Sequence, residues 1–412
     1  MMENHFNTQS IHTGYPKQDP YGSLQFPVYG TNAFEFATAE AMADAFTGKT
    51  TEFTYSRISN PTVGYFEKRV AGLTGAFGVT VFNSGMAAIS NIFLNIAYKG
   101  ANIVTSPHLF GNTYSLFAST LKAFGVETRF CDLTNPNELS NAIDQNTCAV
   151  FLEIVTNPQL EIANLEAVSA IARQKNIPLV ADTTAVPFCA FKAKDHQIDI
   201  EVVSSTKYIS GGATSLGGIV IDYGTFDWTD KQGLKDFASL GKGAFTAKLR
   251  KETHRNVGAY MTPHTAQAQL LGLETLSLRF AQAASSCLQI AGELQQMAKI
   301  QTVNYPGLAS NPFHSLAKKQ FGELPGAMLT FDLSSKETCF AFLNRLKLIK
   351  RATNLFDNKS LIIHPASTIF GMFSQDVRDR MNISDGTVRL SVGLEDVDDL
   401  LDDIRQALGQ YF

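Results

Sequence analysis

The sequence predicts an α/β protein with a mostly parallel sheet sandwiched by helices and a smaller α+β domain in its C-terminal part. Between about residues 75 and 225, short apolar segments rich in β-branched residues alternate with amphipathic helical segments. This alternation is typical of parallel strands joined by helices that cover both faces of the sheet. The C-terminal part lacks this alternation, which indicates a second domain of a different architecture. The length of 412 residues and the content of 44% hydrophobic residues suffice for two domains with large cores.

The expected elements begin with an arm, residues 1–60, which is rich in Gly, Pro, Tyr and Thr and has one helical pattern, at 39–46. Pro61 suits the first turn of a helix, which we expect at 62–73. Strands are expected at 78–82, 102–106, 127–130, 147–153, 178–181, 201–204 and 218–221, with helices at 85–97, 113–124, 135–143 and 165–175. After these we expect a helical region at 265–299, strands near 328–333 and 388–392, and a last helix near 397–408. The predicted domains that follow the arm are therefore 61–257 and 258–412.

Composition and charge exclude several classes of function. The formal net charge is −4 and no block of five like charges occurs, so nothing indicates binding to nucleic acid or to a membrane surface. We find no secretory signal pattern in residues 1–14 and no apolar run of membrane-spanning length. The five cysteines are scattered and the eight histidines are dispersed, which predicts reduced thiols in a cytoplasmic protein and no bound metal.

The residues from 199 to 222 place one lysine, Lys207, in a loop between two apolar strands. An ammonium at a buried sheet edge is costly unless it is paired or neutral. A neutral amine is the form that attacks a carbonyl to make a Schiff base, and the hydroxyls of Ser204 and Thr206 could hold a phosphate. For this stretch alone, a surface turn with a solvated lysine explains the pattern equally well.

Other polar residues follow predicted strands at the same edge of the sheet, where ligands of α/β proteins bind. Gly85 and Met86 open a helix whose free amides suit a phosphate, and Arg57 could add a charge-assisted contact. Asp182 could pair with a protonated pyridine nitrogen, and Asn157 could donate to a phenolate oxygen. Each residue alone fits a helix cap, a turn or a surface ion pair, but together they predict one cofactor site.

Seven short motifs extend over nearly the whole chain, at residues 55–62, 83–88, 156–158, 181–184, 204–208, 361–367 and 388–396. On these motifs the chain resembles the cysteine and methionine metabolism group of pyridoxal-phosphate enzymes, which includes cystathionine synthases and lyases, methionine γ-lyases and O-acetylhomoserine sulfhydrylases. It is most similar to the sulfhydrylases, on residues 214–218, 226–228, 271–279, 303–308 and 357–361. The resemblance implies a transferase of fold type I whose domain 61–257 binds pyridoxal 5′-phosphate.

The resemblance also implies a role for each matching residue. Lys207 forms the Schiff base and moves protons. Cofactor contacts are implied for Tyr55, Arg57, Gly85, Met86, Phe110, Asn157, Asp182, Thr184, Ser204 and Thr206. Tyr55, a further candidate proton donor, and Arg57 reach the phosphate of a neighbouring subunit, so a homodimer is the expected active unit and a homotetramer the expected assembly. Arg389 binds the α-carboxylate of the substrate, and Asn354 contacts the same carboxylate through its main chain.

The sequence departs from the pattern of this group at three places. Phe110 stands where the group has a tyrosine stacked on the cofactor, so the ring face is kept but a phenol that could transfer protons is absent. Gly212 replaces a histidine that follows the lysine, and Ile369 and Phe370 stand near a threonine–histidine step of the group. The departures affect the region that selects the side chain of the substrate.

We interpret the chain as an enzyme of γ-replacement, in which sulfide or a small thiol displaces acetate from O-acetylhomoserine to give homocysteine or methionine. A γ-lyase, which eliminates thiol from methionine, cystathionine or homocysteine to give an α-keto acid and ammonia, remains the alternative. A dinucleotide oxidoreductase requires a G-x-G-x-x-G after the first strand, where residues 83–88 read NSGMAA. A non-catalytic binding protein has little reason to combine Lys207, Asp182 and Arg389.

Overall fold

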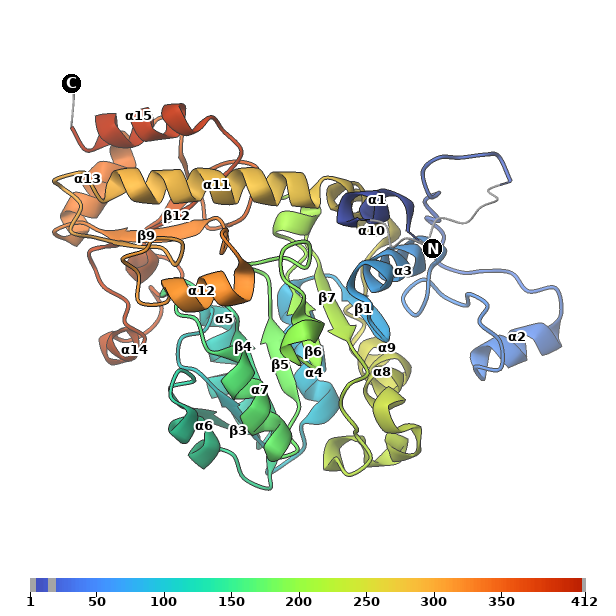
Figure 1. Ribbon diagram of the computed structural model, residues 1–412. Helices are drawn as coiled ribbons and strands as arrows, with labels where there is room; N and C mark the ends of the chain where they lie inside the picture. Colours follow the sequence, from blue (N-terminus) through green and yellow to red (C-terminus); the bar gives the residue numbers. More distant parts are fainter. Residues whose placement is uncertain (1–4, 14–19, 410–412) are drawn as a thin grey trace.

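A computed structural model describes residues 5–13 and 20–409, which are organised around two β-sheets (Figure 1). The first sheet has seven strands: β1 (Gly78–Phe82), β2 (Asn102–Thr105), β3 (Glu127–Phe130), β4 (Thr147–Glu153), β5 (Leu179–Asp182), β6 (Ile200–Val203) and β7 (Gly218–Asp222). Their order across the sheet is β1-β7-β6-β5-β4-β2-β3. β7 runs antiparallel to β1 and β6, whereas the other neighbouring pairs are parallel. The predicted mostly parallel sheet is therefore confirmed.

Helices cover both faces of this sheet because its central strands are apolar on both sides. On β4, Val150 and Leu152 face a core that includes residues of α7 (Leu165–Gln174), whereas Phe151 faces a second core with residues of α4 (Gly85–Ile96). The other helices of this part are α5 (Gly111–Ser115), α6 (Pro136–Ala142), α8 (Ala244–Lys248) and α9 (His254–Val257). A π-helical segment, Leu116–Leu121, continues α5, so the helix predicted at 113–124 starts earlier than expected.

The second sheet lies in the C-terminal part of the chain and has the strand order β10-β11-β12-β9-β8. Its strands are β8 (Thr302–Asn304), β9 (Met328–Asp332), β10 (Lys350–Arg351), β11 (Leu361–Ile363) and β12 (Thr387–Ser391). The helices here are α10 (Pro263–Glu274), α11 (Leu276–Leu294), α12 (His314–Phe321), α13 (Lys336–Arg345), α14 (Gln375–Arg380) and α15 (Val397–Ala407). Figure 1 shows the long α11 beside β9 and β12, with α15 above it. The helical region predicted at 265–299 is divided at Thr275 and ends earlier than expected, at Leu294.

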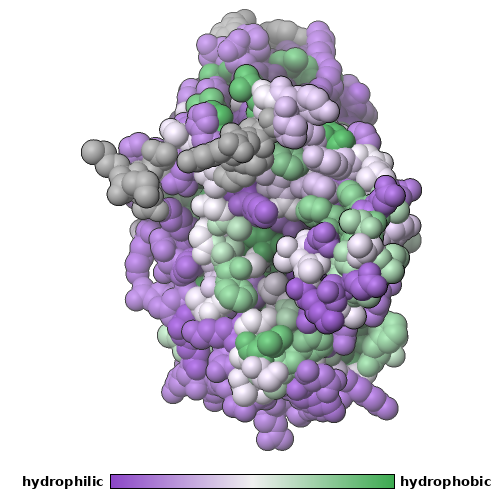
Figure 2. All heavy atoms as spheres, turned by 90° about the vertical axis from the view of Figure 1, so that its right-hand side faces the viewer, coloured by the Kyte–Doolittle hydropathy of each residue, from purple (hydrophilic) through white to green (hydrophobic). Residues whose placement is uncertain are grey.

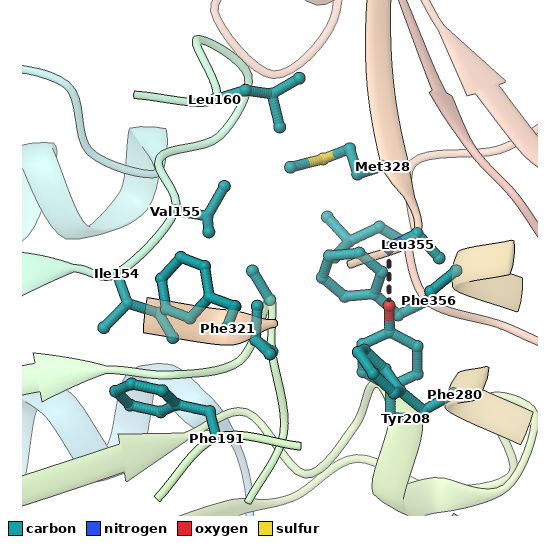
Figure 3. Close-up of a cluster of buried hydrophobic side chains, with 14 of the residues drawn as sticks. Ile154, Val155, Leu160, Phe191, Tyr208, Phe280, Phe321, Met328, Leu355 and Phe356 are labelled. Carbon is teal, nitrogen blue, oxygen red and sulfur yellow. Dashed lines mark hydrogen bonds between the residues drawn. The ribbon is translucent and has the colours of Figure 1, made fainter. Parts of the chain in front are cut away.

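Aromatic side chains of the lysine-bearing loop, of α11 and of the segment around residue 356 pack together in one core (Figure 3). The rings of Tyr208 and Phe356 are stacked with centroids 4.5 Å apart, and Phe280 of α11 meets Tyr208 edge-on at 5.4 Å. The hydroxyl of Tyr208 accepts a hydrogen bond from the main-chain nitrogen of Ala327 at 3.1 Å. Because Tyr208 directly follows Lys207, this core holds the lysine-bearing loop against the C-terminal part.

The arm contributes two helices to the described residues. α1 (Phe6–His12) was not predicted, and its N-terminus has no side-chain cap that could mark it in the sequence. α2 (Ala39–Phe46) confirms the predicted pattern, and Figure 1 shows it set apart from both sheets. Residues 1–4 and 14–19 of the predicted arm lie outside the described residues.

The helix predicted after the arm is present as α3 (Pro61–Thr74). The side chain of Asn60 caps it by accepting from the main-chain nitrogen of Thr62 at 2.9 Å, and Pro61 occupies the first turn, where no amide hydrogen is needed. Gly75 ends it in the left-handed conformation, with φ of 66°. None of the described helices is both long and apolar enough to cross a membrane.

Candidate active site

A cavity of about 920 Å³ lies beyond the carboxyl ends of β4, β5 and β6 and is closed from the other side by the C-terminal part. Its size is that of a site for a cofactor with a small substrate. The predicted site residues that line it are Gly85, Met86, Phe110, Asn157, Asp182, Thr184, Ser204, Thr206, Lys207 and Asn354. Tyr55, Arg57 and Arg389 do not line it.

One end of the cavity is the N-terminus of α4, which suits a phosphate. The hydroxyl of Ser84 accepts from the main-chain nitrogen of Ala87 at 3.1 Å, and the helix geometry leaves the amides of Gly85 and Met86 for an outside acceptor. A Cβ added to Gly85 would lie 2.8 Å from the Ser204 hydroxyl, so glycine lets the helix start approach β6. These amides and the Ser204 hydroxyl fit the phosphate of pyridoxal phosphate.

Thr206 was expected to contact the cofactor phosphate, but in the structure its hydroxyl bonds to Gly217 of the same loop. Its hydroxyl donates to the carbonyl of Gly217 at 3.2 Å and accepts from the nitrogen of the same residue at 3.0 Å. These bonds close the loop between β6 and β7. A phosphate contact by Thr206 would therefore share or replace a bond to Gly217.

Asp182, the last residue of β5, places a partly buried carboxyl in the lining of the cavity. Its Oδ1 accepts from the main-chain nitrogen of Thr184 at 2.9 Å, and the hydroxyl of Thr184 accepts from the nitrogen of Ser204 at 2.8 Å. Burial raises the pKa of Asp182, while the bonds to Thr184 and the charge of Lys207 oppose this rise. A carboxylate of this kind is stabilised by a nearby cation, and the protonated pyridine nitrogen of pyridoxal phosphate would be such a cation.

Lys207 reaches the cavity from the loop after β6, and its Nζ donates to Oδ1 of Asn354 at 2.7 Å. The pKa of Lys207 is lowered to about 8, chiefly by burial and also by the charge of Arg389, against the opposing charges of Asp182 and Asp357. A substantial fraction of the amine is therefore neutral at slightly alkaline pH. The neutral amine is the form that attacks an aldehyde.

Arg389 on β12 is buried behind Asn157 rather than exposed to the cavity. Its Nη1 donates to Oδ1 of Asn157 at 2.9 Å, and its Nη2 donates to the carbonyls of Thr353 and Asn354 at 3.2 and 3.3 Å. Its Nε has no hydrogen-bond partner among the described residues. Burial lowers the pKa of Arg389 to about 9. A buried guanidinium with an unused donor suits an anionic ligand.

The arm residues Tyr55 and Arg57 lie away from this cavity. Tyr55 is 41% exposed. The guanidinium of Arg57 lies 5.5 Å from the centre of the Tyr55 ring and donates from Nη1 to the carbonyl of Arg255 at 2.6 Å. Within one chain the two residues cannot complete the site that they were predicted to serve.

Glu153 lines the cavity and was not singled out in the sequence. It ends β4 opposite Asp182 on β5, and its Oε1 accepts from the main-chain nitrogen of Phe110 at 2.6 Å. The pKa of Glu153 is raised to about 8, chiefly by burial and also by the charge of Asp182, while main-chain hydrogen bonds from Phe110 and Asn157 oppose the rise. The signal that could have found it is a carboxyl at the end of an otherwise apolar strand, followed by Asn157.

We expect Glu153→Gln to flatten the dependence of stability on pH in the cofactor-free protein. Because the pKa of Glu153 is raised on folding, its stabilising effect is complete below the ordinary glutamate range and is lost as the pH rises toward 8. Glutamine keeps an acceptor for Phe110 and cannot ionise, so the variant should be more stable than the wild type at pH 8 by on the order of 1–3 kcal/mol.

Thermal unfolding between pH 5 and 8 measures this difference. Glu166→Gln is the matched control, because Glu166 is an exposed glutamate paired with Lys319, and it should keep the wild-type slope. Equal slopes for Glu153→Gln and the wild type would show that Glu153 ionises normally. Glu201 and Asp222, whose pKa values burial raises to about 7 and about 6, contribute slopes of the same sign and remain in every variant.

Among the described residues, no group of three or more His, Cys, Asp or Glu side chains is placed to hold a metal ion. The five cysteines are free thiols.

Comparison with known proteins identifies relatives over nearly the whole chain. The family model described as "Cys/Met metabolism PLP-dependent enzyme" matches residues 7–409. The O-acetyl-L-homoserine sulfhydrylase of Corynebacterium glutamicum is 34% identical over 418 residues, covering 97% of this chain and 95% of its own. The L-methionine γ-lyase of Pseudomonas deceptionensis is 36% identical, covering 98% and 97%.

A crystal structure from Campylobacter jejuni, described as an O-acetylhomoserine (thiol)-lyase with pyridoxyl-lysine monophosphate, superposes with a TM-score of 0.94 at 33% identity. The match covers 98% of this chain and all of the other.

Proposed function

Because the chain belongs to the family of pyridoxal-phosphate-dependent enzymes of cysteine and methionine metabolism, we propose that it catalyses γ-replacement on O-acetylhomoserine. The bond between Cγ and the acetyl oxygen breaks, and Cγ forms a bond to the sulfur of sulfide or of a small thiol. The products are acetate and homocysteine, or acetate and methionine when the thiol carries a methyl group. The observation that carries the proposal is the meeting of Lys207, Asp182 and the start of α4 at one cavity, in a chain similar to a sulfhydrylase along nearly its whole length.

Pyridoxal phosphate, when bound, supplies an aldehyde that combines with amino groups and a ring that withdraws electrons from the substrate Cα. Lys207 would hold the aldehyde and would take the proton from Cα of the substrate, a task that its lowered pKa favours. Asp182 would hold the protonated ring nitrogen, and the start of α4 with Ser204 would hold the phosphate. Arg389 would bind the α-carboxylate of the substrate through its Nε, the nitrogen that has no partner among the described residues.

Steady-state assays with O-acetylhomoserine, O-succinylhomoserine, cystathionine and methionine, each with and without sulfide, test the proposal. We expect homocysteine from O-acetylhomoserine only when sulfide is present. The second candidate is a γ-lyase, which the similarity to L-methionine γ-lyase favours. Formation of α-ketobutyrate from methionine without added thiol would identify that activity instead.

Phe110 bears on the choice between these activities. It lines the cavity, its main-chain nitrogen donates to Glu153, and its ring stands where the group has a phenol that could donate a proton. Acetate is a better leaving group than a thiolate and needs less help from an acid. We therefore propose that the loss of the phenol is tolerated for acetate and limits the elimination of thiols.

Phe110→Tyr is expected to raise the elimination of thiol from methionine or cystathionine by up to about 10²-fold, because a general acid contributes about that much or more. Replacement on O-acetylhomoserine should change much less. Initial rates of α-ketobutyrate and homocysteine formation measure the two effects. Unchanged elimination in the variant would rule out the leaving-group explanation.

The arm supports a proposal about assembly. Figure 2 shows the face on the side of the arm, where apolar side chains gather around a hollow between hydrophilic ones. Exposed apolar residues of the arm include Tyr29, Met42, Phe46, Phe53 and Tyr55. Apolar surface of this kind marks contact with another protein. We propose that the arm packs on a second copy and brings Tyr55 and Arg57 to its phosphate site, in a homodimer or homotetramer.

The positions of the two sheets support the proposed domain boundaries. The seven-stranded sheet and its helices end with α9 at Val257, and α10 opens the part that contains the five-stranded sheet. We propose domains 61–257 and 258–412, with the site at their junction.

A further inference from the structure

Asn354 contacts both groups that are proposed to handle the substrate. Its Oδ1 accepts from Nζ of Lys207 at 2.7 Å, and its main-chain carbonyl accepts from Nη2 of Arg389 at 3.3 Å. Its Nδ2 donates to Oδ2 of Asp357 at 3.3 Å, which orients the amide so that the oxygen faces the lysine. The resemblance implies only a main-chain contact of Asn354 to the substrate, whereas the structure places its side chain on Lys207.

The segment that carries Asn354, residues 353–358, is held rigidly against the lysine-bearing loop. Phe356 stacks on Tyr208, as Figure 3 shows, and Asn358 donates from Nδ2 to the carbonyl of Gly211 at 2.9 Å. The main-chain nitrogen of Phe356 donates to the hydroxyl of Ser391 at 2.7 Å. Phe356 has φ of 55°, a left-handed conformation that is costly for a bulky residue and persists only where the surroundings impose it. The segment is therefore a preformed support and not a loose loop.

We propose that the side chain of Asn354 is a positioning residue for Lys207. It holds the amine of Lys207 next to the substrate Cα during proton transfer. The main-chain carbonyl of Asn354 accepts from Arg389, which is proposed to bind the substrate carboxylate. The inference rests on the proposed roles of Lys207 and Arg389, and it does not depend on which leaving group the substrate carries.

The bond to Asn354 has a consequence for the protonation of Lys207. An amide oxygen binds an ammonium more strongly than a neutral amine, so Asn354 favours the charged form. Burial and the charge of Arg389 favour the neutral amine, whereas the charges of Asp182 and Asp357 favour the charged form, as Asn354 does. Asn354→Ala should therefore lower the pKa of Lys207, whereas Asn354→Asp, which adds a negative charge at nearly the same shape, should raise it.

The first measurement uses the cofactor-free protein. Trace acetylation with acetic anhydride over a range of pH, followed by mass spectrometry of the peptide that contains Lys207, gives the pKa of its amine. We expect the Asn354→Ala and Asn354→Asp values to lie on opposite sides of the wild-type value. Asn358→Ala is the matched control, because it removes a bond between the same two segments without touching Lys207, and it should leave the pKa unchanged.

The second measurement is the exchange of the Cα proton of L-alanine with deuterated water by the enzyme loaded with pyridoxal phosphate. Asn354→Ala should slow the exchange by about 10²-fold at saturating amino acid, because displacing a reacting group by about 1 Å costs roughly this much. The absorbance of the bound cofactor and the melting temperature show that the variant is folded and loaded. Asn358→Ala should exchange at nearly the wild-type rate.

An unshifted pKa of Lys207 in both Asn354 variants would overturn the inference, and so would an equal loss of exchange in Asn358→Ala. L-Alanine has no γ-substituent, so wild-type exchange remains measurable even if O-acetylhomoserine is not the substrate. A failure of the proposed function would appear separately, as wild-type exchange without turnover of O-acetylhomoserine.

Discussion

Replacing Lys207 with arginine is expected to abolish the reaction, with a loss in kcat of at least about 10³-fold. A guanidinium is protonated at neutral pH, and its protonated form can neither combine with the cofactor aldehyde nor take a proton from Cα. The wild-type lysine can do both because burial lowers its pKa to about 8. Absorbance of the lysine-bound cofactor should be missing from the variant, and borohydride should no longer attach pyridoxal phosphate to the peptide that contains residue 207.

Lys359→Arg is the matched control for this substitution. Lys359 is an exposed lysine whose Nζ lies 4.0 Å from Oδ1 of Asp357, close to the site but outside the cavity. Its variant should keep the cofactor absorbance and nearly the full rate. Borohydride labelling of a different lysine in the wild type would contradict the assignment of Lys207 as the reactive amine.

Arg389→Lys is expected to raise the KM for the amino-acid substrate on the order of 10²-fold, because hydrogen bonds to charged groups contribute about 1.5–3 kcal/mol. Lysine keeps the positive charge but cannot offer a free donor to the carboxylate and at the same time make the bonds of Nη1 and Nη2 to the protein. In the structure the guanidinium also binds Asn157 and the carbonyl of Thr353, so a lysine would leave buried acceptors without donors. Initial rates over a range of substrate concentration separate the effect on KM from that on kcat.

Arg351→Lys provides the control, because Arg351 is an exposed arginine of β10 in the same sheet, and its variant should keep the wild-type KM. An amine that resembles the substrate but lacks the carboxylate should bind the wild type and Arg389→Lys with equal affinity. If Arg389→Lys weakened both ligands alike, the arginine would be acting on the shape of the site and not on the carboxylate.

Local sequence patterns predicted most strands and helices of this chain. The apolar segments at 147–153 and 218–221 are strands within one residue of the expected bounds, because a strand buried on both faces leaves a continuous apolar run. The start of α3 was predictable from Pro61 and the capping Asn60. α1 and the division of the helical region at Thr275 were not predictable, because neither has a local signal as strong as a proline or a cap.

Apart from Asn354, the predicted residues that line the cavity follow strands of the parallel sheet. Gly85, Asp182 and Lys207 come directly after or at the end of β1, β5 and β6, and the strand order places β5 and β6 side by side. Position after a strand was therefore enough to group them, since carboxyl ends of parallel strands share one edge. The identity of the cofactor was predicted from the resemblance to a known family, because the positions of these residues do not by themselves specify pyridoxal phosphate.

Periodicity and motifs in the sequence thus determine which faces are buried and which residues follow the strands, because both are properties of short segments. Tertiary packing decides which distant side chains touch. Asn354 binds Lys207 from 147 positions away, and Arg389 binds Asn157 from 232 positions away. The raised pKa of Glu153 and the lowered pKa of Lys207 arise from burial between the two parts of the chain, and no short segment contains that information.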